Sequence, residues 1–262
     1  MRVNAAWARL CVFGASVFAT SLAIGLSLAA PSGAADNYPN RKVRVIVPFA
    51  AGGPTDVIAR MVSERLSEAW GQQLYVENMP GAGGNLGVET GGRAAPDGYT
   101  IIAVSTGFII NPSMYSKIGY DPVKDFAPIS LVAASPNVVT VHPSVSAKIG
   151  NITDGSLRGI AILAKARVAA LPELPTNVEE GVPGLESDTL TGIVAPAGTP
   201  KAIVDKWNAE IIKMVADPAT KKKLDTLGFV PVANSPSEFA ERIKSEMARW
   251  DKVVKTAGIQ VD

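Results

Sequence analysis

Cysteine and histidine are almost absent from this chain of 262 residues, which holds one of each, Cys11 and His142. Cys11 lies within the first 35 residues, so the rest of the chain can form neither a disulfide nor a thiolate metal site. A single histidine without cysteines also excludes the usual zinc spacings. We therefore expect a fold stabilised by its hydrophobic core, with no metal, and we interpret His142 as structural or solvated.

A surplus of charge of one sign is also lacking. The chain has 25 Lys and Arg against 24 Asp and Glu, and removal of Arg2 and Arg9 with the first 35 residues leaves 23 basic residues against 24 acidic ones. A nearly neutral chain does not favour nucleic acid or an anionic membrane as a partner.

A long apolar run occurs only near the start. Arg2 and Arg9 precede an uncharged stretch at 10–30, and small residues follow at 33–35. This pattern predicts a secretory signal peptide over residues 1–35. An uncleaved membrane anchor stays open as the alternative, because the run is long enough to span a bilayer.

The motifs of common enzymes are missing. There is no Gly-Lys-Ser/Thr and no G-x-S-x-G, and "GAGGNLG" (81–87) has Leu86 where the dinucleotide fingerprint needs glycine. Carboxylate pairs such as Glu179–Glu180 fall in a loop-like stretch. We therefore expect no catalysis and no cofactor.

What the chain does have is an alternation of strands and helices. "KVRVIVPF" (42–49), "QQLYVEN" (72–78) and "YTIIAVS" (99–105) read as strands, and a helix is predicted from Pro54 until Gly71. This order predicts an α/β fold with a parallel sheet. Later helices are expected after Thr199 as N-cap, and after a Ser235–Glu238 capping box, with an apolar stripe at Phe239, Ile243, Met247, Trp250 and Val254.

The stretch "PFAAGGPTD" (48–56) joins the first strand to the first helix. The first N–H groups of a helix lack intrahelical acceptors, and the helix dipole adds positive charge there, so a small anion can bind. Because no lysine or arginine lies in the loop, the pattern favours a carboxylate over a di- or triphosphate. An ordinary tight turn remains the alternative, and Asp56 either starts the helix or binds a ligand ammonium.

Longer stretches resemble a known family. "YPNRKVRVIVPFAAGGPTDVIAR", "GQQLYVENMPGAGGNLG", "GIVAPAGTP" and "SPSEFAERIKSEMARWDKVVK" follow the order found in the tripartite tricarboxylate transporter substrate-binding proteins, the Bug family. The resemblance covers nearly all of the chain after residue 35. It implies a type II periplasmic binding-protein fold of two α/β domains. It also implies a periplasmic, monomeric protein that delivers a small carboxylate solute to membrane permease subunits or to a sensor domain.

The family also implies where the ligand binds, with carboxylate contacts that are partly bridged by water. The matching residues here follow the first and third strands: Phe49, Ala50, Ala51, Gly52, Gly53, Pro54, Thr55, Asp56, Ser105, Thr106 and Gly107.

One segment departs from the family pattern. Several dozen residues that the family carries in its second domain are missing between Lys148 and Ile152. We expect domain one at 36–138 and 187–262, and a remnant of domain two at 139–186 in which Ile160, Ile162 and Leu163 are poorly covered. Solute binding is expected to be impaired, and a non-binding relic or a protein-interaction or sensing module is the alternative function.

Overall fold

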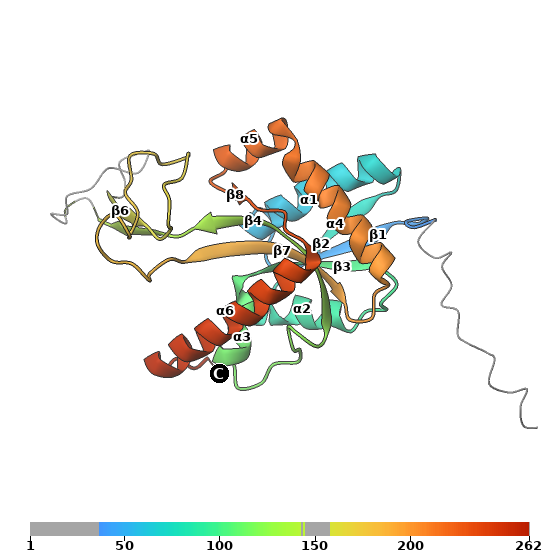
Figure 1. Cartoon of the computed structure of the whole chain (residues 1–262). Coiled ribbons are helices and arrows are strands. Elements are labelled where there is room, and N and C mark those ends of the chain that lie inside the picture. Colours follow the sequence, from blue (N-terminus) through green and yellow to red (C-terminus); the bar gives the residue numbers. More distant parts are fainter. Residues whose placement is uncertain (1–36, 143, 145–157, 262) are drawn as a thin grey trace, which may run out of the picture. The chain divides into compact units, whose positions relative to one another are not determined.

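The fold is described from a computed structural model, which describes residues 37–142, 144 and 158–261 (Figure 1). The predicted signal peptide and the junction between Lys148 and Ile152 lie outside these residues. The elements below belong to the compact unit Tyr38–Asp262. Within the described part, no helix is both long and apolar enough to cross a membrane.

A six-stranded sheet forms the centre, in the order β2-β1-β3-β7-β4-β8. β1 runs parallel to β2 and β3, whereas β7 runs antiparallel to both β3 and β4, and β8 is antiparallel to β4. The expected parallel sheet is confirmed for β1, β2 and β3, but the whole sheet is mixed, because β7 and β8 pair with their neighbours in antiparallel direction. The strands are β1 (Val43–Val47), β2 (Leu74–Asn78), β3 (Thr100–Ser105), β4 (Phe126–Pro136), β7 (Asp188–Pro196) and β8 (Val230–Pro231).

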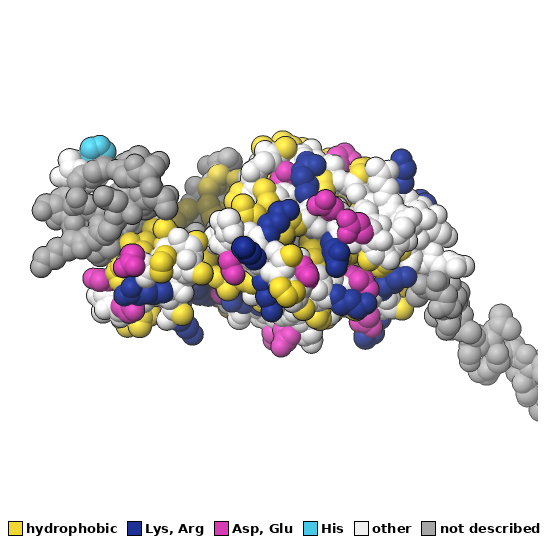
Figure 2. Space-filling view, turned by 90° about the horizontal axis from the view of Figure 1, so that it is seen from above, with side chains coloured by type: hydrophobic (Ala, Val, Ile, Leu, Met, Phe, Trp, Pro, Cys, Tyr) yellow, Lys and Arg dark blue, Asp and Glu magenta, His cyan; other side chains and the backbone are white. Residues whose placement is uncertain are grey.

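Helices cover both faces of the sheet (Figure 1). One face carries α1 (Pro54–Trp70), α4 (Lys201–Ala216) and α5 (Pro218–Thr226), and its core includes the fully buried Trp207. The other face carries η1 (Ala82–Gly84), α2 (Asn85–Gly92), α3 (Thr106–Met114) and α6 (Pro236–Ala257), with Phe239 in its core. Acidic and basic side chains are interspersed over the face with α4 and α5 (Figure 2), in keeping with the neutral composition.

The helix ends test the local predictions. α1 begins at Pro54 and ends at Gly71 in the left-handed conformation, and Ser235 and Glu238 form the capping box, so these predictions are confirmed. Thr199 as N-cap was wrong. Its hydroxyl donates to the carbonyl of Pro196 at 2.7 Å, and the helix starts two residues later.

The chain leaves the sheet after β4 and returns at β7. Between them lies a small sheet of β5 (Val138–Val141) and β6 (Arg158–Ile162). Asn137 and Ser187 join the two crossing strands: the Asn137 N–H donates to the Ser187 carbonyl at 3.0 Å, and its side-chain amide donates to Ser187 Oγ at 2.8 Å.

The excursion has a small core of its own. Ile162 is fully buried, together with Ala161 and Leu174, so the expectation that Ile162 would be poorly covered was wrong. Residues 175–177 pair with it, because the Ile162 N–H donates to the Pro175 carbonyl and its carbonyl accepts from the Asn177 N–H. Ile160 and Leu163 are half-buried.

Gly192 in β7 tests the packing of α6 on the sheet. A methyl group added there would overlap the ring of Phe239, which is fully buried. We expect Gly192→Ala to lower the free energy of unfolding by about 1–3 kcal/mol, as overpacking does. Urea denaturation measures the change. Gly53→Ala is the control, since the added methyl group approaches only the Ala50 carbonyl, at 3.7 Å; equal effects in both variants would contradict the packing.

Candidate functional site

Three strand ends meet at one edge of the sheet. β2, β1 and β3 are parallel neighbours, so each finishes at the same edge, and each passes there into a helix: β1 into α1, β2 into η1 and β3 into α3. This topology places both predicted ligand segments, 49–56 and 105–107, at the same edge.

The turn before α1 leaves main-chain donors free. In the described structure the N–H groups of Thr55 and Asp56 have no acceptor, whereas the Val57 N–H makes the first helical bond, to Gly53. Gly53 is extended, and a Cβ added there would make only an ordinary contact, with the Ala50 carbonyl at 3.7 Å. Among the predicted residues here, Phe49 and Gly53 are half-buried, and those exposed are Ala50, Ala51, Gly52 and Pro54.

Asp56 fixes this turn. It is 2% exposed. Its Oδ2 accepts from the Gly52 N–H and from Arg60 Nε, both at 2.8 Å, and Oδ1 accepts from the Asn78 amide at 2.9 Å. The hydrogen bond from Arg60, followed by those from Gly52 and Asn78, lowers the pKa of Asp56 to about 2. With these bonds made, the structure favours the helix-start role of Asp56 over ammonium binding.

Thr55 lies deeper than we expected. It is 4% exposed, although it belongs to the predicted ligand segment. Its N–H remains at the helix start, but a bulky side chain at this position would disturb the fold. Gly53 is therefore the better position for testing the turn.

The third junction has no loop, because α3 begins at Thr106 directly after β3. The Thr106 hydroxyl accepts from the Leu190 N–H at 3.0 Å and donates to the Asp188 carbonyl at 3.4 Å. That hydroxyl therefore ties α3 to β7. Ser105 makes no capping hydrogen bond, and Gly107 is half-buried. The groups at this junction that could donate to a ligand are therefore the Ser105 hydroxyl and the first N–H groups of α3.

The glycine-rich turn after β2 lies between the two predicted segments. A Cβ added to Gly84 would lie 3.1 Å from the Phe49 ring, and one added to Gly107 would lie 3.5 Å from the Gly83 carbonyl. Asn111 Nδ2 donates to that carbonyl at 3.1 Å. The sequence analysis did not place Gly83, Gly84 or Asn111 next to the predicted segments, although the glycine run was a visible signal.

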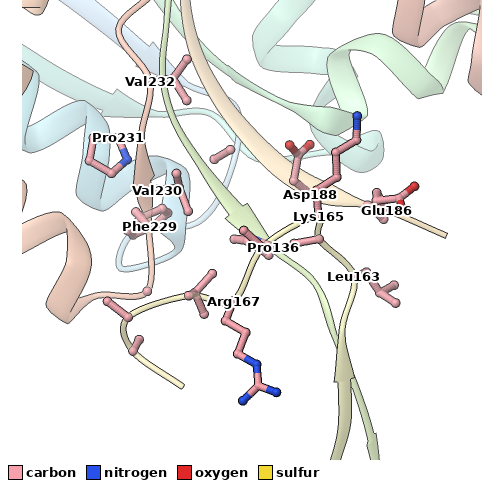
Figure 3. A pocket seen from close by; sticks show the side chains of 18 of the residues that line it. Pro136, Leu163, Lys165, Arg167, Glu186, Asp188, Phe229, Val230, Pro231 and Val232 are labelled. Atoms are coloured by element: carbon pink, nitrogen blue, oxygen red, sulfur yellow. The ribbon is translucent and has the colours of Figure 1, made fainter. Parts of the chain in front are cut away.

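A large cavity opens outside the predicted ligand segments. A space of about 790 Å³ opens between β8, α6 and residues 163–170, and none of the predicted ligand residues lines it. Sheet order puts β8 on one side of the crossing strands β4 and β7, and β1 and β3 on the other. Figure 3 shows Phe229–Val232 along one wall and Lys165, Glu186 and Asp188 along another. No cluster of three metal-ligating side chains occurs among the described residues.

Comparison with known proteins identifies the class. The family described as tripartite tricarboxylate transporter family receptor (TctC) matches residues 58–150 and 143–259. The chain therefore belongs to this family of solute-binding receptors, with their mixed α/β periplasmic binding-protein fold, and it is not an enzyme.

Particular relatives agree. A protein from the tcbD–tcbE intergenic region of Pseudomonas sp. (strain P51) is 29% identical over 84% of this chain and 87% of its own length. The periplasmic binding protein BugD superimposes with a TM-score of 0.76 at 29% identity, covering 85% of this chain and 99% of its own. The structure of R. palustris Rpa4515 with adipate superimposes with a TM-score of 0.77 at 27% identity, covering 85% of this chain and 99% of its own. MatC from Rhodopseudomonas palustris with bound malate superimposes with a TM-score of 0.74 at 26% identity, covering 83% of this chain and 100% of its own.

These matches show that the chain is shorter than its relatives. The Pseudomonas alignment spans 292 positions, whereas 84% of 262 residues is about 220, so about 72 positions have no counterpart here. The two family matches meet at residues 143–150, which agrees with the predicted gap after Lys148.

The Asp56 cluster generates a pH prediction. A carboxyl group with a lowered pKa stabilises the fold above its unfolded pKa, near 3.8, and loses that contribution as the pH falls toward about 2. We expect Asp56→Asn to be less stable than the wild type at pH 7 by about 1–3 kcal/mol, as for hydrogen bonds to a charged group.

The difference between the two proteins should shrink between pH 4 and pH 2, measured by urea denaturation at each pH. Other carboxylates titrate in both proteins and cancel in the comparison. A stability difference that stays constant down to pH 2 would contradict the assigned role of the Asp56 charge.

Proposed function

We propose that this receptor captures a small carboxylate solute in the periplasm and presents it to the permease of a tripartite tricarboxylate-type transporter or to a sensor. Family membership supports the receptor role, and related structures hold adipate and malate. The basic start and apolar run of residues 1–35 support export.

The observation that carries the proposal is the pair of helix starts at one sheet edge. α1 and α3 both begin there, with main-chain N–H groups that have no intrahelical acceptor. Two such starts attract an anion through their dipoles and donate hydrogen bonds to it, directly or through water. Neither segment, 49–56 or 105–107, has a basic residue, which suits a carboxylate better than a polyphosphate.

The missing family residues bear on affinity. Cleft proteins gain affinity when two walls close, because water exclusion strengthens each polar contact. With one wall shortened, the carboxylate stays hydrated, and exposed charge interactions contribute only about 0–1 kcal/mol each. We expect a dissociation constant of about 1 mM or weaker. If no solute binds at all, a non-binding relic or a protein-interaction or sensing module becomes the better-supported function.

Gly53→Val tests the turn before α1. The valine side chain would add bulk at the helix start, where a Cβ at this position approaches only the Ala50 carbonyl, at 3.7 Å, so we expect loss of dicarboxylate binding with an unchanged thermal unfolding midpoint. NMR titration of the chain from residue 36 with adipate and with malate, up to tens of millimolar, measures binding in the range expected for a hydrated site.

Gly53→Ala serves as the graded control and should weaken binding less than valine. Binding of the same dicarboxylate with unchanged affinity in Gly53→Val would remove this turn from the site.

A further inference from the structure

Asp188 places a negative charge beside the proposed carboxylate site. It is the first residue of β7, and its carbonyl accepts from the hydroxyl of Thr106, the first residue of α3, at 3.4 Å. The main-chain N–H of Leu190, two residues further along β7, donates to the same hydroxyl. These bonds bring the main chain of Asp188 to the start of α3, and its carboxylate, which lines the cavity beside α6, would repel an anion bound at that start.

Arg242 of α6 neutralises that charge. Its Nη2 lies 3.2 Å from each of the two carboxylate oxygens of Asp188. The two side chains are 36% and 29% exposed, so the pair is partly shielded from water and salt. The pair joins α6 to the point where β7 enters the sheet.

The surrounding charges balance in pairs. Glu246 Oε1 lies 3.1 Å from Arg242 Nε, and Glu246 Oε2 lies 3.7 Å from Arg249 Nη1. Two arginines thus face Asp188 and Glu246 with no net charge. Lys165 and Glu186, which Figure 3 shows beside Asp188, carry opposite charges and so add no net charge. Loss of Arg242 alone would leave one net negative charge next to α3.

We infer that Arg242 is a positioning residue for anion binding: it acts through Asp188, by removing the repulsion that this carboxylate would exert on a solute at the start of α3. The inference rests on the carboxylate function proposed above. It also assigns Asp188 a defined effect, since the uncompensated aspartate selects against anions, and more strongly against dianions than against monoanions.

A purely structural role of the ion pair predicts a different result. If the pair served only to hold β7 against α6, loss of either partner would loosen the same contact and weaken binding in both cases. If Arg242 acts through charge, the two substitutions change the affinity in opposite directions. Arg242→Gln weakens dicarboxylate binding, whereas Asp188→Asn, which leaves the arginine uncompensated, strengthens it.

The experiment is an NMR titration with adipate of the chain from residue 36 and of both variants, at low salt and at 1 M NaCl. We expect the dissociation constant to rise roughly threefold in Arg242→Gln and to fall by a similar factor in Asp188→Asn. Both changes should disappear at 1 M NaCl, where the Debye length is about 3 Å. The double variant Arg242→Gln with Asp188→Asn should return to the wild-type affinity.

Lys244→Gln is the matched control, because it removes the same charge from α6 but from an exposed pair with Glu241. Weaker binding in both single variants, or changes that persist at high salt, would overturn the inference in favour of a structural pair. Unchanged affinity in both would overturn it as well. Failure of the wild type itself to bind any dicarboxylate would instead reject the proposed function on which the inference rests.

Discussion

The placement of β7 between β3 and β4 is the constraint on which the other features depend. Because β7 runs antiparallel to both neighbours, its first residues lie at the edge where β1 and β3 end. The return of the chain is thereby brought against the start of α3, where Thr106 bonds the main chain of β7. It also gives α6 a charged contact with the crossing point through Asp188. The start of β7 therefore contacts both α3, at the proposed ligand edge, and the C-terminal helix α6.

The proposed site has no lysine or arginine in its two segments, 49–56 and 105–107. In this proposal main-chain N–H groups at two helix starts are the donors, and a rigid turn keeps them in position. Asp56 provides that rigidity, since its buried carboxylate binds Gly52, Arg60 and Asn78 together. The positive charge in this region thus serves the scaffold, through Arg60 and Arg242, and leaves the edge free for a solute carboxylate.

The local pattern of the sequence was enough to predict the strands, the start and end of α1 and the capping box of α6, because short-range rules govern these features. The antiparallel β7 was not foreseen, since strand direction depends on an excursion of some fifty residues. The bonds of Asp56 with Asn78 and of Thr106 with Leu190 span 22 and 84 residues, and no local spacing reports such contacts. The burial of Ile162 was missed for a similar reason, because its main chain pairs with residues 175–177, which local spacing does not report.

The central claim is that the carboxylate edge is intact while the opposite wall is shortened. The most direct measurement inserts a family-like block between Lys148 and Ile152 and compares it with the natural chain. Both are titrated with the same dicarboxylates, and compaction is followed by small-angle scattering. We predict binding at about 1 mM or weaker and no compaction for the natural chain, with tighter binding and compaction for the lengthened one. Micromolar binding with compaction by the natural chain would contradict the account.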